Sequence, residues 1–118
     1  MVKKNKEVCQ IPCFNKNKVN RIQKSILPQE DLNSLIELFK TISDNTRTKI
    51  LLSLKDAELC VCDICNVLGM SLSAVSHQLR LLRNLKLVKY RSQGKMAFYS
   101  LTNKYIINLI QEGIRHIR

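Results

Sequence analysis

Five cysteines are the residues of this chain best suited to chemistry, and four of them form two close pairs. Cys9 and Cys13 lie near the N-terminus, Cys60 and Cys62 lie mid-chain, and Cys65 follows three residues later. Thiolates select soft metal ions: four in a tetrahedron suit Cd(II), Pb(II) or Zn(II), and three in a pyramid suit arsenite. The pairs therefore predict a soft-metal site, although Cys is also a common small buried residue, and Cys65 alone needs no other explanation.

Helix geometry limits how the mid-chain cysteines can act. Residues two apart on a helix point away from each other, so Cys60 and Cys62 cannot hold one ion within a regular helix. Either Cys60 lies just outside the helix, or metal binding distorts the helix start. Cys62 and Cys65, three apart, share a face. In each case a bound ion pulls on the beginning of this helix.

Composition favours one cytoplasmic, largely helical domain. The 118 residues are 45% hydrophobic but only 5% aromatic, so the core must come from Leu, Ile and Val, which recur mostly at helical spacing. No apolar run approaches the roughly 18 residues of a membrane span, and no apolar signal region follows the basic start. We expect a cytoplasmic protein without a membrane partner, whose odd number of cysteines does not form a disulfide framework.

The net charge of +11 suits a polyanionic partner, and its distribution is informative. Residues 64–111 contain no Asp or Glu. The basic residues of this acid-free stretch are Arg80, Arg83, Lys86, Lys89, Arg91, Lys95 and Lys104. Such a stretch repels itself without a counter-charge, which DNA phosphates would supply.

Apolar periodicity predicts the elements that position these residues. Helices are expected near residues 32–42, 46–54, 61–68, 72–85 and 105–117, with a weaker one near 19–26 in a polar, flexible arm. Gly69 is suited to stop the helix at 61–68, and Ser71 to cap the next. A helix, a glycine turn and a second helix form a helix-turn-helix.

The second helix of this pair has two distinct faces. Val75, Leu79 and Leu82 lie on one side. The opposite side carries Ser73, Ser76, His77 and Arg80. This side carries short hydroxyl groups, an imidazole that can donate and an arginine, but no acidic residue. Such a face is suited to enter the major groove of double-stranded DNA. The simpler alternative is an ordinary solvated face.

Two strand-like runs at residues 87–90 and 96–101 flank the polar residues 91–95 and predict a basic-tipped hairpin. Behind a recognition helix, such a hairpin can lay Arg91 and Lys95 along the sugar-phosphate backbone. An ordinary surface hairpin is the alternative.

The last helix carries an apolar stripe that needs a partner. It either folds back on its own core or, with the helix at 32–42, pairs two subunits into a homodimer that presents recognition helices about 34 Å apart. Because an ion at the mid-chain cysteines pulls on the first helix of the helix-turn-helix, metal and DNA binding are expected to oppose each other, typically by about 1 to 3 kcal/mol.

With these motifs in place, the sequence resembles the ArsR/SmtB family of metal-responsive repressors and, within it, the cadmium-responsive CadC branch. The resemblance rests on residues 42–47, 58–64, 75–82 and 94–101, together with the arm cysteines. It implies a mainly α, winged helix-turn-helix homodimer. Residues 1–30 would be an arm with two metal-ligand cysteines, and residues 31–118 a domain for DNA binding and dimerisation.

The resemblance also implies a metal site and an activity. Cys9 and Cys13 of one subunit would join Cys60 and Cys62 of the other around Cd(II), Pb(II) or Zn(II). That ion would release operator DNA and relieve repression of a metal-resistance or efflux operon. Cys65 completes a pattern like that of the arsenic-responsive branch, so the alternative is an arsenite- or antimonite-responsive repressor using Cys60, Cys62 and Cys65.

The sequence differs from the family pattern in two further places, near the end of the chain and just before the hairpin. Related zinc sensors carry an Asp-x-His and a His-x-x-Glu pair on the last helix, but the matching residues here are Asn103, Lys104 and Tyr105, with only His116 remaining. That second metal site is expected to be lost. Lys86 stands where many relatives have Gly, so a left-handed turn there would cost about 1 kcal/mol.

Other functional classes fit the pattern less well. A catalytic thiol needs a nearby base, and His77 and His116 are placed elsewhere, so no enzyme is expected. A redox-sensing repressor would form disulfides among Cys60, Cys62 and Cys65 and respond to peroxide without metal. A thiolate-rich metal carrier leaves the acid-free stretch and the polar helix face unexplained.

Overall fold

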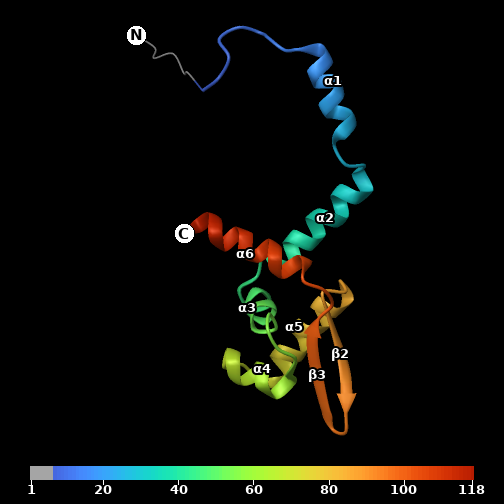
Figure 1. Cartoon of the computed structure of the whole chain (residues 1–118), viewed down its shortest axis with the longest axis vertical. Coiled ribbons are helices and arrows are strands. Elements are labelled where there is room, and N and C mark those ends of the chain that lie inside the picture. The colour runs from blue at the N-terminus through green and yellow to red at the C-terminus, as the bar shows by residue number, and fades with distance from the viewer. Residues whose placement is uncertain (1–6) are drawn as a thin grey trace. The chain divides into compact units, whose positions relative to one another are not determined.

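The computed structural model describes residues 7–118 and divides the chain into two compact units, residues 1–33 and 34–118 (Figure 1). In the first unit, α1 (Lys16–Ser25) begins after Asn15, whose side chain accepts a hydrogen bond from the Lys18 amide at 3.0 Å. Within Lys16–Ser25 no residue is buried. The weak helix predicted in the arm is present, but it has no core of its own. Residues 1–6 of the predicted arm lie outside the described residues.

The remaining elements follow the predicted order, apart from a short strand at residues 59–60 that was not predicted. They are α2 (Gln29–Ile42), α3 (Asn45–Ser53), β1 (Leu59–Cys60), α4 (Val61–Leu68), α5 (Leu72–Asn84), β2 (Val88–Gln93), β3 (Met96–Leu101) and α6 (Tyr105–Ile117). Each predicted helix is found within a few residues of its expected bounds. The mainly helical fold with a small antiparallel hairpin is confirmed.

The core of the second unit lies where α3, α4 and α5 meet the hairpin. Its fully buried side chains are Ile50, Leu51, Ile64, Val75, Leu79 and Leu82. The three α5 residues expected to point inward are among them. Burying this aliphatic surface stabilises the fold because each such side chain contributes roughly 1.5–3 kcal/mol.

A glycine turn sets α5 against α4, as predicted. Gly69 adopts φ +64°, and the Met70 amide then donates to the Cys65 carbonyl at 3.1 Å. Ser71 opens α5, since its hydroxyl accepts from the Ala74 amide at 3.2 Å. The turn therefore joins two helices with both ends capped, which fixes the position of α5 on the core.

The end of α5 is a second left-handed turn, and here the residue is Lys86, at φ +59°. The Lys86 amide donates to Arg83 O at 2.9 Å, and the Leu87 amide donates to Leu82 O at 3.0 Å. These two bonds form a Schellman motif, in which the left-handed position is usually Gly. The left-handed turn anticipated at Lys86 is thus present, with its backbone strain.

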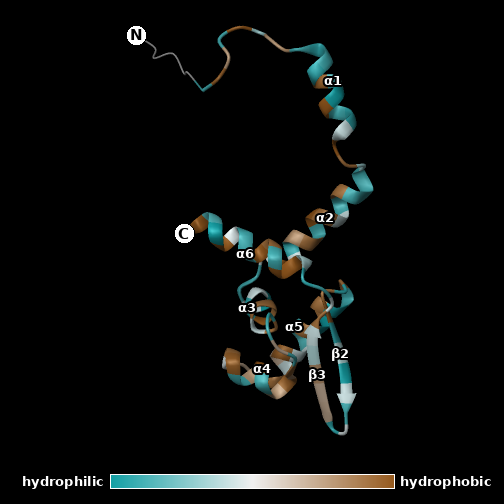
Figure 2. Cartoon of the chain, viewed as in Figure 1, coloured by the Kyte–Doolittle hydropathy of each residue, from teal (hydrophilic) through white to brown (hydrophobic). Residues whose placement is uncertain are grey.

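β2 and β3 form an antiparallel hairpin, and β1 pairs with the other side of β3, in the order β1-β3-β2. The predicted loop at residues 91–95 was too long: Arg91, Ser92 and Gln93 belong to β2, and only Gly94 and Lys95 make the turn. Gly94, at φ +61°, allows this two-residue connection. Figure 2 shows why β2 resembled a loop, since it is hydrophilic along most of its length beside the more apolar β3.

α6 spans the predicted residues but is only partly covered in the second unit. Ile106 and Ile107 are buried. Leu109 and Ile117 remain 43% and 80% exposed. Over residues 7–118, none of the helices has both the length and the apolar character needed to cross a membrane.

Replacing Lys86 by Gly should stabilise the fold by about 1 kcal/mol, because Gly adopts the left-handed conformation without the Cβ strain and the exposed Lys86 side chain loses little. Urea unfolding followed by circular dichroism measures this change. The matched control is Gly69→Ala, which introduces the same strain into open space and should destabilise by a similar amount. A loss of stability in Lys86→Gly would contradict the strain at this turn.

Candidate metal centre and DNA interface

The two arm cysteines lie close together in the first unit. The Cys13 thiol donates to Cys9 Sγ across 3.3 Å, and both side chains are exposed. This hydrogen bond raises the pKa of Cys13, so its proton is held more firmly than usual. In a tetrahedral zinc site with Zn–S bonds of 2.3 Å, neighbouring sulfurs are about 3.8 Å apart. A small opening of the pair therefore reaches the separation at which two thiolates can share an ion.

Cys60 stands at a junction between two elements. It is the last residue of β1 and the N-cap of α4, with extended backbone dihedrals and only 8% of its surface exposed. Its amide donates to Asp63 Oδ2 at 3.4 Å. Of the two arrangements left open above, Cys60 lies just outside the helix.

The other two mid-chain cysteines differ in exposure. Cys62, in the first turn of α4, is exposed, whereas Cys65 is half-buried and packs against the core. Among the described residues, no three Cys, His, Asp or Glu side chains form a cluster able to hold a metal. The structure therefore brings Cys9 and Cys13 together, and Cys60, Cys62 and Cys65 lie in or next to the first turns of α4.

α5 presents the predicted polar face to solvent. Ser73, His77 and Arg80 are exposed, and Ser76 is half-buried, opposite the buried apolar face. This arrangement leaves an imidazole and a guanidinium available on the second helix of the helix-turn-helix, where DNA readers make base contacts.

Arg47 holds α5 in place, a role that the sequence reasoning missed. Its Nη1 donates to Gln78 Oε1 on α5 at 2.9 Å, and its Nε donates to the Thr41 carbonyl near the end of α2. Its amide is capped by Asp44 at 3.0 Å. One guanidinium therefore joins α2, α3 and α5, and the side-chain oxygen of Gln78 accepts a hydrogen bond from within the protein.

The hairpin, residues 88–101, is attached to α5 by aromatic and cationic contacts. The Arg83 guanidinium lies 5.0 Å from the centre of the Tyr90 ring, which in turn stacks on Tyr99 at 5.5 Å. Such cation–π contacts stabilise by roughly 0.5–1 kcal/mol at exposed sites. Arg83, counted with the basic residues of the acid-free stretch, thus has a structural partner.

The two basic hairpin residues predicted to meet DNA have different surroundings. Lys95 is exposed in the two-residue turn. Arg91 lies in β2, where Nε and Nη2 donate to the Glu58 carboxylate at 3.0 and 2.7 Å and the guanidinium covers the Phe98 ring at 4.6 Å. The hydrogen bond to Glu58 holds the pKa of Arg91 above its usual value, so this group stays charged.

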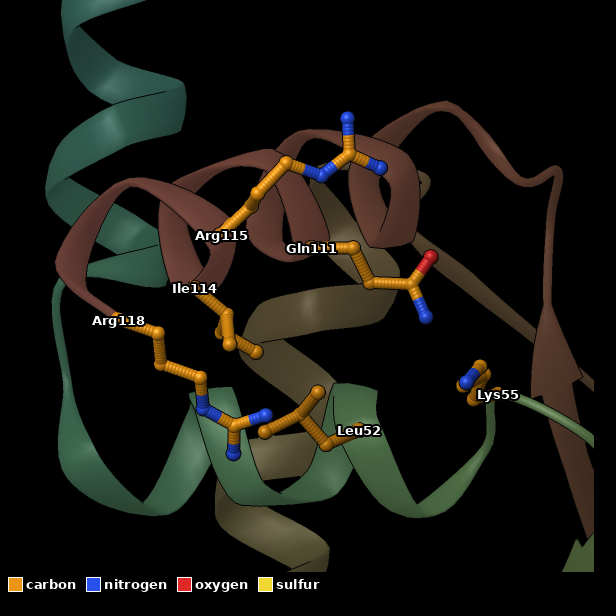
Figure 3. Close-up of a pocket in the computed structure, with 6 residues that line it drawn as sticks. All are labelled: Leu52, Lys55, Gln111, Ile114, Arg115 and Arg118. Carbon is orange, nitrogen blue, oxygen red and sulfur yellow. The ribbon is translucent and has the colours of Figure 1, made fainter.

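A separate hollow of about 740 Å³ lies between α3 and α6 (Figure 3). Its lining consists of Leu52, Lys55, Gln111, Ile114, Arg115 and Arg118. Ile114 of α6 and Arg118, which follows α6, point towards Leu52, whereas Arg115 points away. Since this lining has no thiol, imidazole or carboxylate, the hollow is not a soft-metal site.

Comparison with known proteins decides the family. A Staphylococcus aureus protein described as a cadmium resistance transcriptional regulatory protein, CadC homologue, is 40% identical over 115 residues, which cover 96% of this chain and 93% of that protein. The chain belongs to the ArsR family. The family model described as "Bacterial regulatory protein, arsR family" matches residues 44–90, from the cap of α3 into β2. Membership in a family of regulators confirms the expectation that this is not an enzyme.

Other similarities extend the comparison. An SmtB transcriptional repressor homologue of Synechocystis sp. is 35% identical over 111 residues, covering 94% of this chain and 84% of that protein. The structure of reduced HlyU from Vibrio cholerae superposes with a TM-score of 0.68 at 30% identity, covering 74% of this chain and 92% of that one. The winged helix-turn-helix expected for an ArsR family member is therefore confirmed.

Arg80 and Lys95 should differ in what they contribute to DNA binding. Arg80→Ala should weaken operator binding by about 1–3 kcal/mol and relax sequence preference, whereas Lys95→Ala should weaken binding to all duplexes alike and lower the salt slope by about 1. Fluorescence anisotropy on the DNA upstream of the gene and on a scrambled duplex, at several salt concentrations, separates the two effects. An equal loss of discrimination in both variants would refute these roles.

Proposed function

We propose that this protein is a repressor that binds operator DNA of a metal-resistance or efflux operon as a homodimer and releases it when cysteine thiolates capture Cd(II), Pb(II) or Zn(II). The observation that carries the proposal is the position of Cys60. Because this residue ends β1 and caps α4, a ligand that draws on its thiol also acts on the first helix of the helix-turn-helix.

DNA binding is supported by the exposed face of α5 and by the charge around it. Ser73, Ser76, His77 and Arg80 are proposed to meet base edges in the major groove, and Arg91 and Lys95 the sugar-phosphate backbone. The acid-free stretch over residues 64–111 contains both sets. Phosphates supply the counter-charge that this stretch lacks.

Metal binding is supported by the donor set. Cys9 and Cys13 are proposed to act with Cys60 of the partner subunit and Cys62 of the partner subunit, which gives the four sulfurs that these soft ions favour. The ion, when bound, supplies the positive charge that keeps the thiolates deprotonated and together. Capture requires Cys13 to give up the proton that it shares with Cys9, so uptake releases protons and strengthens as pH rises.

A homodimer is supported by apolar surface that the second unit leaves uncovered. Ile36 and Phe39 of α2 are 42% and 40% exposed, and Leu109 and Ile117 of α6 are more exposed still. Exposed aliphatic and aromatic side chains on two helices are typical of a self-complementary interface.

A metal-release titration tests the proposed function. The reduced protein is bound to fluorescent DNA from upstream of its own gene, and Cd(II) or arsenite is added separately while anisotropy is followed. Release by about one Cd(II) per subunit, with arsenite weak, is expected of a four-thiolate site. Release by arsenite alone would move the switch to Cys60, Cys62 and Cys65, and no DNA binding at low salt would refute the repressor.

Cys62→Ser should leave DNA binding intact but abolish release by Cd(II), because Cys62 is exposed and its loss removes one thiolate without disturbing the core. The same anisotropy titration measures both properties. Cys65→Ser is the matched control, expected to keep release because Cys65 packs against the core. Normal release in Cys62→Ser would remove this residue from the site.

A further inference from the structure

The three-stranded sheet places Cys60 in one row with two side chains of the hairpin. Cys60 pairs with Phe98 of β3, and Phe98 pairs with Arg91 of β2. Residues directly opposite each other on neighbouring strands lie on the same face of a sheet. A single face therefore carries the cysteine at the start of α4, an aromatic ring and a guanidinium, in that order.

The Arg91 guanidinium is also connected to the segment that carries Cys60. Glu58, two residues before Cys60, receives Arg91 Nε at 3.0 Å and Arg91 Nη2 at 2.7 Å. Arg91 Nη1 donates to Gln93 Oε1 at 2.8 Å, and the flat face of the guanidinium covers Phe98. A bidentate arginine with both its edge and its face occupied has a defined orientation.

The strength of this connection suits a reversible contact. β1 contains only two residues, so its ladder with β3 is short, and the Glu58–Arg91 pair adds a direct attachment to β2. The Arg91 and Glu58 side chains are 52% and 34% exposed, and ion pairs with that degree of exposure contribute only about 0.2–1 kcal/mol. An attachment of this strength orders the hairpin and costs little to break.

We propose that the Glu58–Arg91 pair transmits the state of the cysteine segment, residues 58–62, to the hairpin. In the metal-free protein the pair holds β2 against this segment. When the thiols are drawn to a metal, Glu58 moves with β1, and the hairpin loses that hold at the same time as α4 is displaced. The inference rests on the proposed function, and it makes Glu58 and Arg91 positioning residues: Arg91 acts through Glu58 in addition to its proposed contact with a DNA phosphate.

The first arm of the test uses neither metal nor DNA. Cys60 is buried, so its alkylation by iodoacetamide reports separation of β1 from β3, and the exposed Cys62 gives an internal reference. In the reduced full chain, Glu58→Gln and Arg91→Gln should each raise the Cys60 rate about threefold, measured by mass spectrometry of the labelled peptides. Lys89→Gln, an exposed change in the same strand, is the matched control and should leave it unchanged.

The second arm measures how strongly Cd(II) weakens DNA binding in the same variants and in the double variant. Glu58→Gln and Arg91→Gln should both keep Cd(II) uptake, which is followed by thiolate absorbance. Each substitution should reduce metal-induced release of DNA severalfold. The double variant should reduce this release no further than either single variant does. If Arg91 only binds phosphate, Arg91→Gln weakens metal-free DNA binding, and Glu58→Gln changes neither release nor the Cys60 rate.

The two arms separate failure of this inference from failure of the proposed function. Unchanged Cys60 rates in both variants overturn the link, whatever the metal does. Faster Cys60 alkylation with normal metal-induced release overturns transmission. If Cd(II) binds the unaltered protein without releasing DNA, the proposed function fails, while the alkylation arm still decides whether the pair joins the cysteine segment to the hairpin.

Discussion

One residue ends a strand and caps the helix that follows, and the rest of the second unit is arranged around that constraint. Cys60 is paired to β3 on one side and starts α4 on the other, so α4 cannot shift without changing the sheet. The Gly69 turn then positions α5 on α4, and Arg47 joins α5 to α2 and α3. A force on the buried Cys60 side chain therefore acts on both the sheet and α4, which a force on an exposed side chain does not.

The fold also determines which charged residues have partners. The acid-free stretch repels itself, and the fold relieves part of that repulsion internally: Arg83 lies over Tyr90, and Arg91 lies over Phe98 and pairs with Glu58, which precedes the stretch. Arg80 and Lys95 remain exposed. Some basic residues of this region thus help to assemble the hairpin and others do not, and counting charge along the chain does not distinguish them.

Helices and capped turns could be predicted from the sequence because their signals are local. Periodicity located every helix, and the glycine turn at Gly69 and the left-handed Lys86 were anticipated. β1 could not be found, since two residues show no alternation. Residues 91–93 of β2 were read as loop because they are polar. The contacts of Arg47 with Gln78 and of Arg91 with Glu58 span about 30 residues, and pairings at that separation leave no trace in composition or spacing.

The Lys86 turn has a further consequence for how the molecule moves. Only three residues separate the end of α5 at Asn84 from the start of β2 at Val88, and two backbone hydrogen bonds close the turn between them. Such a connection has almost no slack. Rotation of α5 therefore carries the base of the hairpin with it, so the angle between α5 and the hairpin is set by this corner and not by the hairpin's own length.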